Sequence, residues 1–510
     1  MILYTFSYII KISIFLLEVP MKRVIDAPSS SLLVIGGGLA GMYAALSARK
    51  AGVPDVTLLS KGRAGGSGNS VVAMSVHRFA PDAPGLREEY RLRFRASSAG
   101  IQDPEIADFF VEHAAGAMEA LKSCDLPLHY RTLPEGAGQY DYLACCDPKQ
   151  GRILTQALRS RIDADSGIRV LDGVTACDFL VENNRIAGVL ALCGEEFQVF
   201  PANAVVLACG GAGNIYAATS NTSDLTGDGY CMAARCGLPL RDMEFVQFYP
   251  YRIYAPRRAD IFPDIFEHGA VFRNARGIRF MDTPQYPKKE LENRDVVARA
   301  MFREEGVHLD LTGCSMEYLE RECPNIARMH RDFPDQPLLV RPVAHFFMGG
   351  IPLRQDCSTD LAGLYVCGEV TGGLHGANRL AGSALTETVL FGGIAGREAA
   401  RFAASPAPAC SAQAVARVMD DYPVSGTDDL TGLKRRLRQV MWEHVSVIRT
   451  RSGLEQALQE LASIQAEFSA CHPADWKAWL QLRNLLFTAE AVARAALQRP
   501  ESLGAHYRIN

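Results

Sequence analysis

The sequence lacks the spaced cysteine pairs that hold zinc or iron–sulfur clusters. Its 14 cysteines are scattered, the nearest approach to a motif is the adjacent pair Cys145-Cys146, and no C-x-x-C occurs. Structural zinc and cluster ligation need such spacings. We therefore expect no metal site, and reduced thiols in a cytoplasmic protein.

Two further absences exclude classes of partner. Lys and Arg form no block that stands out from the mixture, and the formal net charge is −4. These features argue against nucleic acid as a partner. After residue 20 no apolar segment is long enough to span a bilayer, so we expect no integral membrane segment in the mature chain.

Residues 1–30 form a leader with two interpretations. Residues 1–20 are apolar and aromatic, but they contain Lys11, have no basic start and are short for a spanning helix. Met21 then opens a polar stretch before the first strand. We favour a start assigned too far upstream; a membrane-directed leader is the alternative.

The first ordered motif is a strand, a glycine turn and a helix. An apolar strand at 31–35 precedes GGGLAG, in which Gly36, Gly38 and Gly41 give G-x-G-x-x-G. In this context the helix N-terminus, with Leu39 and Ala40, can receive a pyrophosphate. The turn predicts nucleotide binding.

The second strand departs from the pattern of NAD dehydrogenases. It ends in Ser60-Lys61, where an acidic residue would hold the ribose. The loop 61–75, rich in Gly and Ser, is either a flexible connector or a lining for the same nucleotide. A strand ending in Gly210-Gly211 is either a second nucleotide contact or an ordinary core strand with a turn.

The remaining periodicity indicates several domains, as 510 residues exceed one compact core. A helical pattern runs through 87–125, and strands are expected at 168–176, 178–184 and 186–200 with Asn183-Asn184 as a hairpin turn. Residues 240–338 are more polar and richer in proline, which indicates an inserted domain. Residues 405–408 predict a linker, and 429–500 show sustained helical periodicity.

Function is expected to concentrate in 345–385, which places His345 and Arg379 among glycine-rich turns and a strand ending in Cys367-Gly368-Glu369. In the inserted domain, 293–300 predicts a helix with Asn293 as its cap. Arg294 in its first turn is either a salt-bridged surface residue or a functional one.

The chain resembles the flavoprotein family of fumarate reductase, succinate dehydrogenase and L-aspartate oxidase from Leu32 to Arg508. The motifs that carry the resemblance occur in the same order. They are VIGGGLAG, LLSKG, VVLACGG, TGDGYCMAARCG, MEFVQFYP, RFM, NRDVVARA, AHFFMGGI, GLYVCGEV, GLHGANRLAGSAL and GAHYR.

The resemblance implies an α/β fold with a Rossmann-type FAD-binding domain (31–239 and 339–404), an inserted α+β capping domain (240–338) and a C-terminal helical domain (410–510). Glu369 is expected to hold the ribityl chain. Asn69 stands where members with tethered flavin have His, so FAD should bind without a covalent link. The implied FAD contacts are Gly36, Gly38, Leu39, Ala40, Gly41, Ser60, Lys61, Gly66, Ser67, Asn69, Ser70, Gly210, Gly211, Asp228, Glu369, Ser383 and Leu385.

The resemblance also assigns the chemistry. Arg294 would transfer the proton, while His345 and Arg379 hold one substrate carboxylate; Glu292, Asp295 and Arg299 are candidates for a relay that reprotonates Arg294. Flavin chemistry of this kind also requires that water be excluded.

The sequence departs from the family at the second carboxylate. Tyr249 replaces the His of Q-F-H-P-T, and the Thr-Glu pair is missing from 261–269. A second carboxylate without polar partners would cost several kcal/mol. We therefore expect an acid with one carboxylate and a different far end, which Tyr249 stacks on or hydrogen-bonds; the alternative is a packing Tyr.

The leading hypothesis is a hydride exchange between flavin N5 and the carbon next to a carboxylate. The alternatives are L-aspartate oxidase and a non-catalytic flavin-binding electron-transfer subunit. A small carboxylate is the expected substrate, with an electron-carrier or iron–sulfur subunit as the expected partner.

Overall fold

The computed structural model describes residues 24–510 except 125, 135–139, 146–149, 407 and 510. The interpretations of residues 1–20 and Met21, of Cys146 and of Ala407 in the predicted linker fall on residues outside the described ones. The chain enters the fold before residue 30, because Val24–Asp26 pairs in parallel with Phe197 to Val199. The described cysteines are free thiols.

A large mixed sheet forms the centre of the molecule, with strands in the order β7-β3-β2-β10-β9-β8 and with β1 and β17 also paired to β10. The strands β2, β3, β7 and β17 run parallel to their neighbours, whereas β8, β9 and β10 form an antiparallel meander. β17 adds to this sheet after a long excursion of the chain. The strands are β1 (Val24–Asp26), β2 (Ser30–Ile35), β3 (Val56–Ser60), β7 (Ile168–Asp172), β8 (Val174–Glu182), β9 (Arg185–Cys193), β10 (Glu196–Leu207) and β17 (Leu364–Val366).

The predicted hairpin at Asn183-Asn184 is confirmed: both residues have positive φ, at 51° and 57°. The predicted break near residue 177 is wrong. The chain turns instead at Gly173, with φ of 78°, and β8 passes through Cys177 with only a bulge between Ala176 and Asp178.

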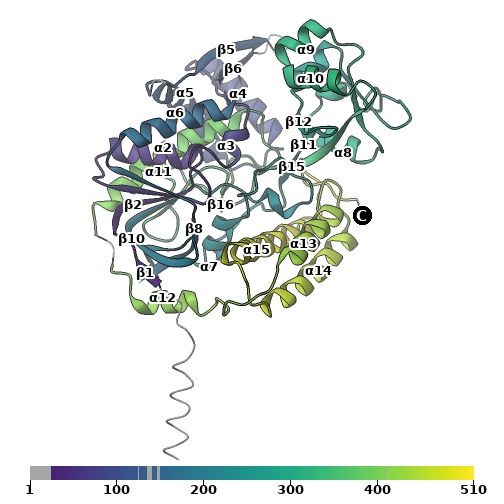
Figure 1. Ribbon diagram of the computed structural model, residues 1–510. Coiled ribbons are helices and arrows are strands. Elements are labelled where there is room, and N and C mark those ends of the chain that lie inside the picture. The colour runs from purple at the N-terminus through teal and green to yellow at the C-terminus, as the bar shows by residue number, and fades with distance from the viewer. Residues whose placement is uncertain (1–23, 125, 135–139, 146–149, 407, 510) are drawn as a thin grey trace, which may run out of the picture.

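Two crossing helices cover one face of the sheet: α2 (Leu39–Lys50) and α11 (Ser383–Ala403) (Figure 1). Their backbones approach closely, because a Cβ at Gly396 would lie 2.2 Å from the carbonyl oxygen of Ala44. The approach of α11 brings the loop before it to the turn that starts α2. α6 (Gly151–Ala164) packs beside α2.

The single helical pattern expected over 87–125 is two helices, α4 (Pro84–Ser97) and α5 (Pro104–Lys122). The break follows from positive φ at Ala99 and Gly100 and from Pro104, which starts α5 behind an Asp103 cap. A small antiparallel sheet lies nearby, formed by β4 (Val76–Arg78), β5 (His129–Pro134) and β6 (Tyr140–Cys145), after the short α3 (Asn69–Val72).

A second sheet and its helices stand apart from the first, at the upper right of Figure 1. The strand order is β12-β11-β15-β14-β13, and the buried residues of this region form their own hydrophobic cluster. Asn293 occupies the N-cap position of α8, but its side chain makes no capping hydrogen bond, so that part of the prediction is wrong. The elements are β11 (Val246–Ala255), β12 (Ala259–Asp260), η2 (Pro263–His268), β13 (Val271–Arg273), η3 (Lys289–Leu291), α8 (Arg294–Phe302), β14 (His308–Asp310), α9 (Met316–Glu322), α10 (Pro324–Asp332) and β15 (Leu338–Phe347).

The C-terminal helices lie below the large sheet in Figure 1. The helices predicted over 429–500 are confirmed. The buried Arg449 ties them to the last residues, since its Nη1 atom lies 2.7 Å from Nδ1 of His506. No helix among the described residues is long and apolar enough to cross a membrane. The helices are α12 (Ala412–Met419), α13 (Thr431–His444), α14 (Arg451–Ser469) and α15 (Trp476–Gln498); the shorter elements between the sheets are η1 (Gly213–Ile215), α7 (Asp228–Arg235), β16 (Ile351–Pro352) and β18 (Thr371–Gly372).

Candidate active site

A cavity of about 820 Å³ begins at the carboxyl ends of β2 and β3 and reaches the second sheet. All four side chains predicted to be catalytic line it: Tyr249, Arg294, His345 and Arg379. Most of the predicted cofactor contacts line it as well, namely Gly36, Gly38, Leu39, Ala40, Ser60, Lys61, Ser67, Asn69, Ser70, Gly210, Asp228, Glu369 and Leu385.

Four predicted contacts are not among the residues that line the cavity. A Cβ at Gly41 would lie 2.0 Å from the carbonyl oxygen of Gly36, and one at Gly211 would lie 2.5 Å from Oε1 of Glu369. A Cβ at Gly66 would meet the Arg63 side chain, and Ser383 is fully buried against the hydroxyl of Tyr90. Gly41, Gly211 and Ser383 are thus buried against neighbouring parts of the chain, whereas Gly66 is exposed.

The nucleotide end of the cavity is open where a dinucleotide would need room. Gly38 precedes α2, and a Cβ there would meet only the Ser70 hydroxyl, at 3.4 Å; at Gly68 a Cβ would enter open space. The helix N-terminus supplies free amide donors for a pyrophosphate, and Ser70 accepts from the Leu39 N–H at 3.1 Å. The residues at this end therefore fit FAD.

Lys61 and Asp228 form an ion pair at the nucleotide end of the cavity. The Lys61 ammonium lies 2.9 Å from the Asp228 carboxylate, and both side chains are largely buried. Burial would raise the pKa of Asp228, but the Lys61 charge and the hydrogen bonds from Lys61, Thr226 and Asn484 lower it. The ion pair ties the loop after β3 to the start of α7.

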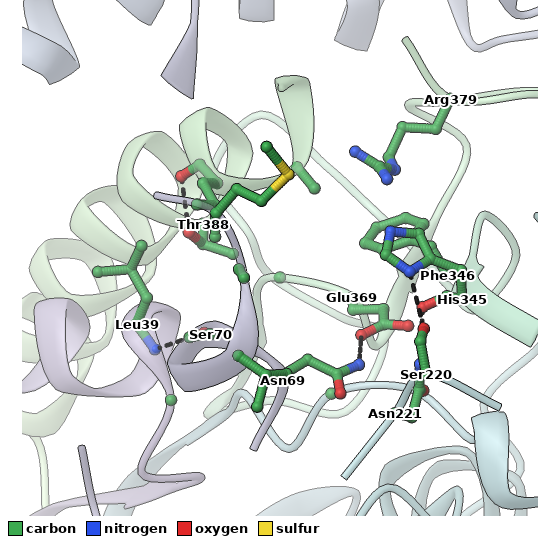
Figure 2. A pocket seen from close by; sticks show the side chains of 18 of the residues that line it. Leu39, Asn69, Ser70, Ser220, Asn221, His345, Phe346, Glu369, Arg379 and Thr388 are labelled. Carbon is green, nitrogen blue, oxygen red and sulfur yellow. Dashed lines mark hydrogen bonds between the residues drawn. The ribbon is translucent and has the colours of Figure 1, made fainter. Parts of the chain in front are cut away.

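Asn69 and Glu369 meet at the centre of the cavity (Figure 2). Asn69 Nδ2 donates to Glu369 Oε2 at 3.2 Å, and Asn69 Oδ1 accepts from the Thr222 N–H at 3.3 Å. Glu369 Oε1 accepts from the Phe347 N–H at 3.1 Å. Burial raises the pKa of Glu369 to about 7, although these donors partly oppose the shift.

Two guanidinium groups converge on one amide oxygen at the substrate end. Gln247 Oε1 accepts from Arg294 Nη1 at 3.1 Å and from Arg379 Nη2 at 2.9 Å. Gln247 Nε2 donates to Asn378 Oδ1 at 2.7 Å, which fixes the direction of the amide. Burial, followed by the charge of Arg294, lowers the pKa of Arg379.

Neither Arg294 nor Arg379 has an ion-pair partner among the described residues, and Nε of Arg379 is buried without a hydrogen bond. Free guanidinium stays protonated well above neutral pH, so both groups remain cations. The surface salt bridge considered for Arg294 is therefore wrong. Two partly satisfied cations that face a cavity make a site for an anion, and a carboxylate matches their planar forks.

His345 lines the same cavity, and Figure 2 shows its contact with Ser220. Its Nδ1 is 2.8 Å from the hydroxyl of Ser220, and its ring stacks on Tyr249 with a centroid distance of 4.9 Å. Burial, Arg379 and Arg294 together hold the pKa of His345 well below its usual value. His345 is thus a neutral hydrogen-bonding group at physiological pH.

The ring of Tyr249 packs against His345 and Arg294. Its hydroxyl donates to the carbonyl oxygen of Ile261 at 2.6 Å, and the Arg294 guanidinium lies 5.0 Å from its ring centroid. The residue is only 3% exposed. The hydroxyl is therefore engaged within the protein, and the predicted hydrogen bond from Tyr249 to the far end of a substrate is not formed by this geometry.

A polar chain leads from the site toward the C-terminal residues. Asn378 Nδ2 donates to Asp295 Oδ1 at 2.9 Å, and Asp295 forms an ion pair of 2.8 Å with Arg299. Arg299 also donates to the Gly504 carbonyl oxygen. Burial raises the pKa of Asp295 despite Arg299. Glu292 also lines the cavity.

Sequence reasoning missed Gln247 and Asn378 as members of the site. Both stood in motifs that carried the resemblance, and a strand places Gln247 on the same face as Tyr249, two residues on. Their roles depend on a contact across 131 residues, which no local pattern contains.

A glycine turn at a helix N-terminus, joined to a buried cluster of cations, defines a nucleotide-dependent oxidoreductase. The family described as FAD binding domain matches residues 31–385, and the one described as fumarate reductase flavoprotein C-term matches 434–510. The chain therefore belongs to the FAD-dependent oxidoreductases of the fumarate reductase, succinate dehydrogenase and L-aspartate oxidase type.

Individual relatives agree over nearly the whole chain. It is 32% identical to an uncharacterized FAD-dependent oxidoreductase of Methanocaldococcus jannaschii, with 94% of this chain and 93% of the relative covered. It is 30% identical to L-aspartate oxidase of Synechocystis, with 94% of each covered. Among solved structures, the FrdA chain of E. coli quinol fumarate reductase is 28% identical with a TM-score of 0.85, covering 95% of this chain and 92% of that one.

Proposed function

We propose that the enzyme exchanges a hydride between FAD and the carbon next to a carboxylate, on a substrate other than a plain C4 dicarboxylate. The observation that carries the proposal is the convergence of Arg294 and Arg379 on Gln247 Oε1 without a carboxylate partner among the described residues. A bound flavin supplies the hydride acceptor or donor at N5. The protein's part is to clamp the acid, exclude water and move the proton.

The carboxylate clamp is formed by Arg379 and His345. Arg379 can donate from its free Nε and from the Nη2 that Gln247 now occupies, so an incoming carboxylate would replace a neutral acceptor by an anionic one. His345, held by Ser220, adds a neutral hydrogen bond. Binding in this closed site orients the acid against the flavin position.

Arg294 is the proposed proton-transferring group. Its guanidinium borders the cavity that Asn69 and Glu369 also line, and the Gln247 amide is its hydrogen-bond partner. Arginine can act only with a relay that restores its proton. Asp295 and Arg299 are suited to this role, since Asn378 links Asp295 to Gln247 and thereby to Arg294.

FAD is proposed to bind without a covalent link. Asn69 has no nucleophilic ring nitrogen, and both ends of its amide are engaged by Glu369 and Thr222. Trichloroacetic acid precipitation should release all the flavin into the supernatant. Flavin that stays with the pellet would contradict this proposal.

Three further parts of the proposal come from the sequence. The domain division into 31–239 with 339–404, 240–338 and 410–510 is supported by the separate sheet and hydrophobic cluster of the second segment. An electron-carrier or iron–sulfur subunit as partner and a cytoplasmic location are the others. Co-purification from the native host tests the partner, and fractionation of the host cells tests the location.

The decisive experiment follows the flavin absorbance of the holoenzyme. The dithionite-reduced enzyme is mixed anaerobically with α,β-unsaturated monocarboxylates or imino acids and, for comparison, with the C4 dicarboxylate fumarate; in parallel the reduced enzyme is mixed with oxygen. Faster reoxidation by an unsaturated monocarboxylate than by fumarate supports the proposal, whereas a clear preference for fumarate would overturn its choice of substrate. Fast reoxidation by oxygen together with bleaching of the oxidised enzyme by L-aspartate would favour the oxidase, for which the Synechocystis relative is the supporting observation.

A further inference from the structure

A second cleft, of about 480 Å³, adjoins the flavin cavity. The two share Val72, Ala73, Met74 and Asp260 in their walls, so they lie side by side along these residues. One wall comes from α3 and the start of α6, and the other from β12, the loop before it and α10 (Figure 1). The cleft therefore lies between the large sheet's helices and the second sheet's region.

The charge of this cleft is positive on both walls. Arg152 comes from the first wall, and Arg257, Arg258 and Arg328 come from the second. The only carboxylate that lines it is Asp260, which already pairs with Arg252 at 2.6 Å. A net excess of guanidinium groups therefore faces the cleft.

Most of these arginines lack a carboxylate of their own. Arg257 forms an ion pair of 3.1 Å with Asp332. Arg152, Arg258 and Arg328 have no ion-pair partner among the residues that the structure describes. Elsewhere on the surface exposed arginines are commonly paired, as Arg321 is with Glu317 and Glu322.

The substrate end of the flavin cavity provides the complementary observation. Tyr249 occupies the position where dicarboxylate-handling relatives have His, and its hydroxyl is bound to Ile261. The Tyr249 hydroxyl is thus unavailable to a second carboxylate near Arg379, whereas Lys288 at the cavity wall and three arginines of the adjoining cleft have no ion-pair partner among the described residues. A second anionic group would have to lie farther from the reacting carbon than in a C4 diacid.

We propose that the adjoining cleft, through Arg152, Arg258 and Arg328, binds an anionic group at the distal end of an extended substrate. This inference rests on the proposed function, because Arg379 and His345 would hold the reacting carboxylate of the same molecule. The chemistry is that of an oxyanion, either a carboxylate or a phosphate. Guanidinium groups accept both through paired N–H donors.

The test is a titration of the oxidised holoenzyme, with the flavin absorbance as the readout of binding. The probes are linear α,ω-dicarboxylates from four to ten carbons and the monocarboxylates of equal length. The variants are the double change R258Q/R328Q and the control R321Q, which removes an exposed, paired arginine outside the cleft. Thermal melting and flavin content show whether each variant is folded.

In the wild type a dicarboxylate of sufficient length should bind about three- to tenfold more tightly than its monocarboxylate, since each exposed charge pair contributes modestly. R258Q/R328Q should abolish this preference without changing the affinity for monocarboxylates, and R321Q should keep it. The preference should shrink between 20 and 300 mM salt because the charges are solvent-accessible.

Inorganic phosphate distinguishes the source of the anion. Competition between phosphate and the long dicarboxylate, in the wild type but not in the double variant, supports the cleft as the site of the distal group. Phosphate that tightens monocarboxylate binding, with no preference for long diacids, would overturn the proposal in favour of a free ion. Monocarboxylate binding without any length preference overturns the cleft alone, whereas no binding of any acid overturns the proposed function as well.

Discussion

The two ends of the flavin cavity are built from different materials. The nucleotide end consists of backbone turns, with Gly36, Gly38 and Gly68 around the start of α2. The substrate end consists of long side chains that reach across from separate strands and helices, such as Arg294 on α8 and Gln247 on β11. The shape of the nucleotide end depends on backbone turns that the local sequence determines, and we expect it to bind one cofactor. A wall of side chains can be rebuilt by a few substitutions, so we expect the substrate to be decided there.

The largest effect on turnover is expected at Arg294, the proposed proton-transferring residue at the substrate end. Arg294→Gln should reduce turnover by about 10³-fold or more, because the proposed proton-transferring group is lost. The flavin should stay bound, since Arg294 belongs to the side-chain end. Stopped-flow reoxidation of the reduced enzyme by an unsaturated acid measures this. Turnover within tenfold of the wild type would rule out the assignment.

Arg379 tests whether the substrate end depends on charge. Arg379→Gln should weaken carboxylate binding by about 10²-fold, because a charge-assisted bond in a desolvated site is replaced by a neutral one. Arg341→Gln is the matched control: Arg341 lies on the neighbouring strand β15, over the ring of Tyr254 and outside the cavity. Titration of the flavin absorbance with a monocarboxylate gives both affinities. An equal loss in the two variants would remove Arg379 from the site.

The difference between the two ends also explains what the sequence could predict. The strand, the glycine turn and the helix after it were predictable because the backbone requirements of Gly36 to Gly41 are local. The resemblance named His345 and Arg379 as site residues, and both line the cavity. Gln247 and Asn378 were missed because their roles arise from contacts between distant segments. The division of 87–125 into two helices was missed because Ala99 and Gly100 adopt positive φ within an otherwise periodic stretch.

Tyr249 tests whether the substrate end was rebuilt by substitution. Tyr249→His should raise the affinity for a C4 dicarboxylate relative to a monocarboxylate by about tenfold, because an imidazole can donate where the tyrosine hydroxyl is held by Ile261. Tyr249→Phe is the control, since it keeps the ring that stacks on His345 and lacks the hydroxyl. Unchanged selectivity in Tyr249→His would mean that the far carboxylate is excluded by the surrounding backbone instead.

The smallest expected effect concerns Glu369, which joins the two ends. Its pKa is raised from 4.5 to about 7, mainly by burial, so the folded apoprotein holds a proton that the unfolded chain has lost between these pH values. The stability of the apoprotein should therefore fall as pH rises from about 4.5 to 7 and level off above that. Glu369→Gln removes this titration. Between pH 5.5 and 7.5 its unfolding free energy should gain about 1 kcal/mol on that of the wild type, a conservative fraction of the full linkage.

Urea unfolding of the two apoproteins across this pH range measures the difference. Asp228→Asn is the matched control, because Asp228 also lines the nucleotide end but its pKa is lowered by Lys61. A folded carboxylate with a lowered pKa stabilises the protein above its unfolded pKa, near 4, and loses that contribution only as pH falls further. The Asp228→Asn difference should thus stay flat between pH 5.5 and 7.5. A flat profile for Glu369→Gln as well would show that Glu369 is ionised throughout, and that the Asn69 and Phe347 donors outweigh its burial.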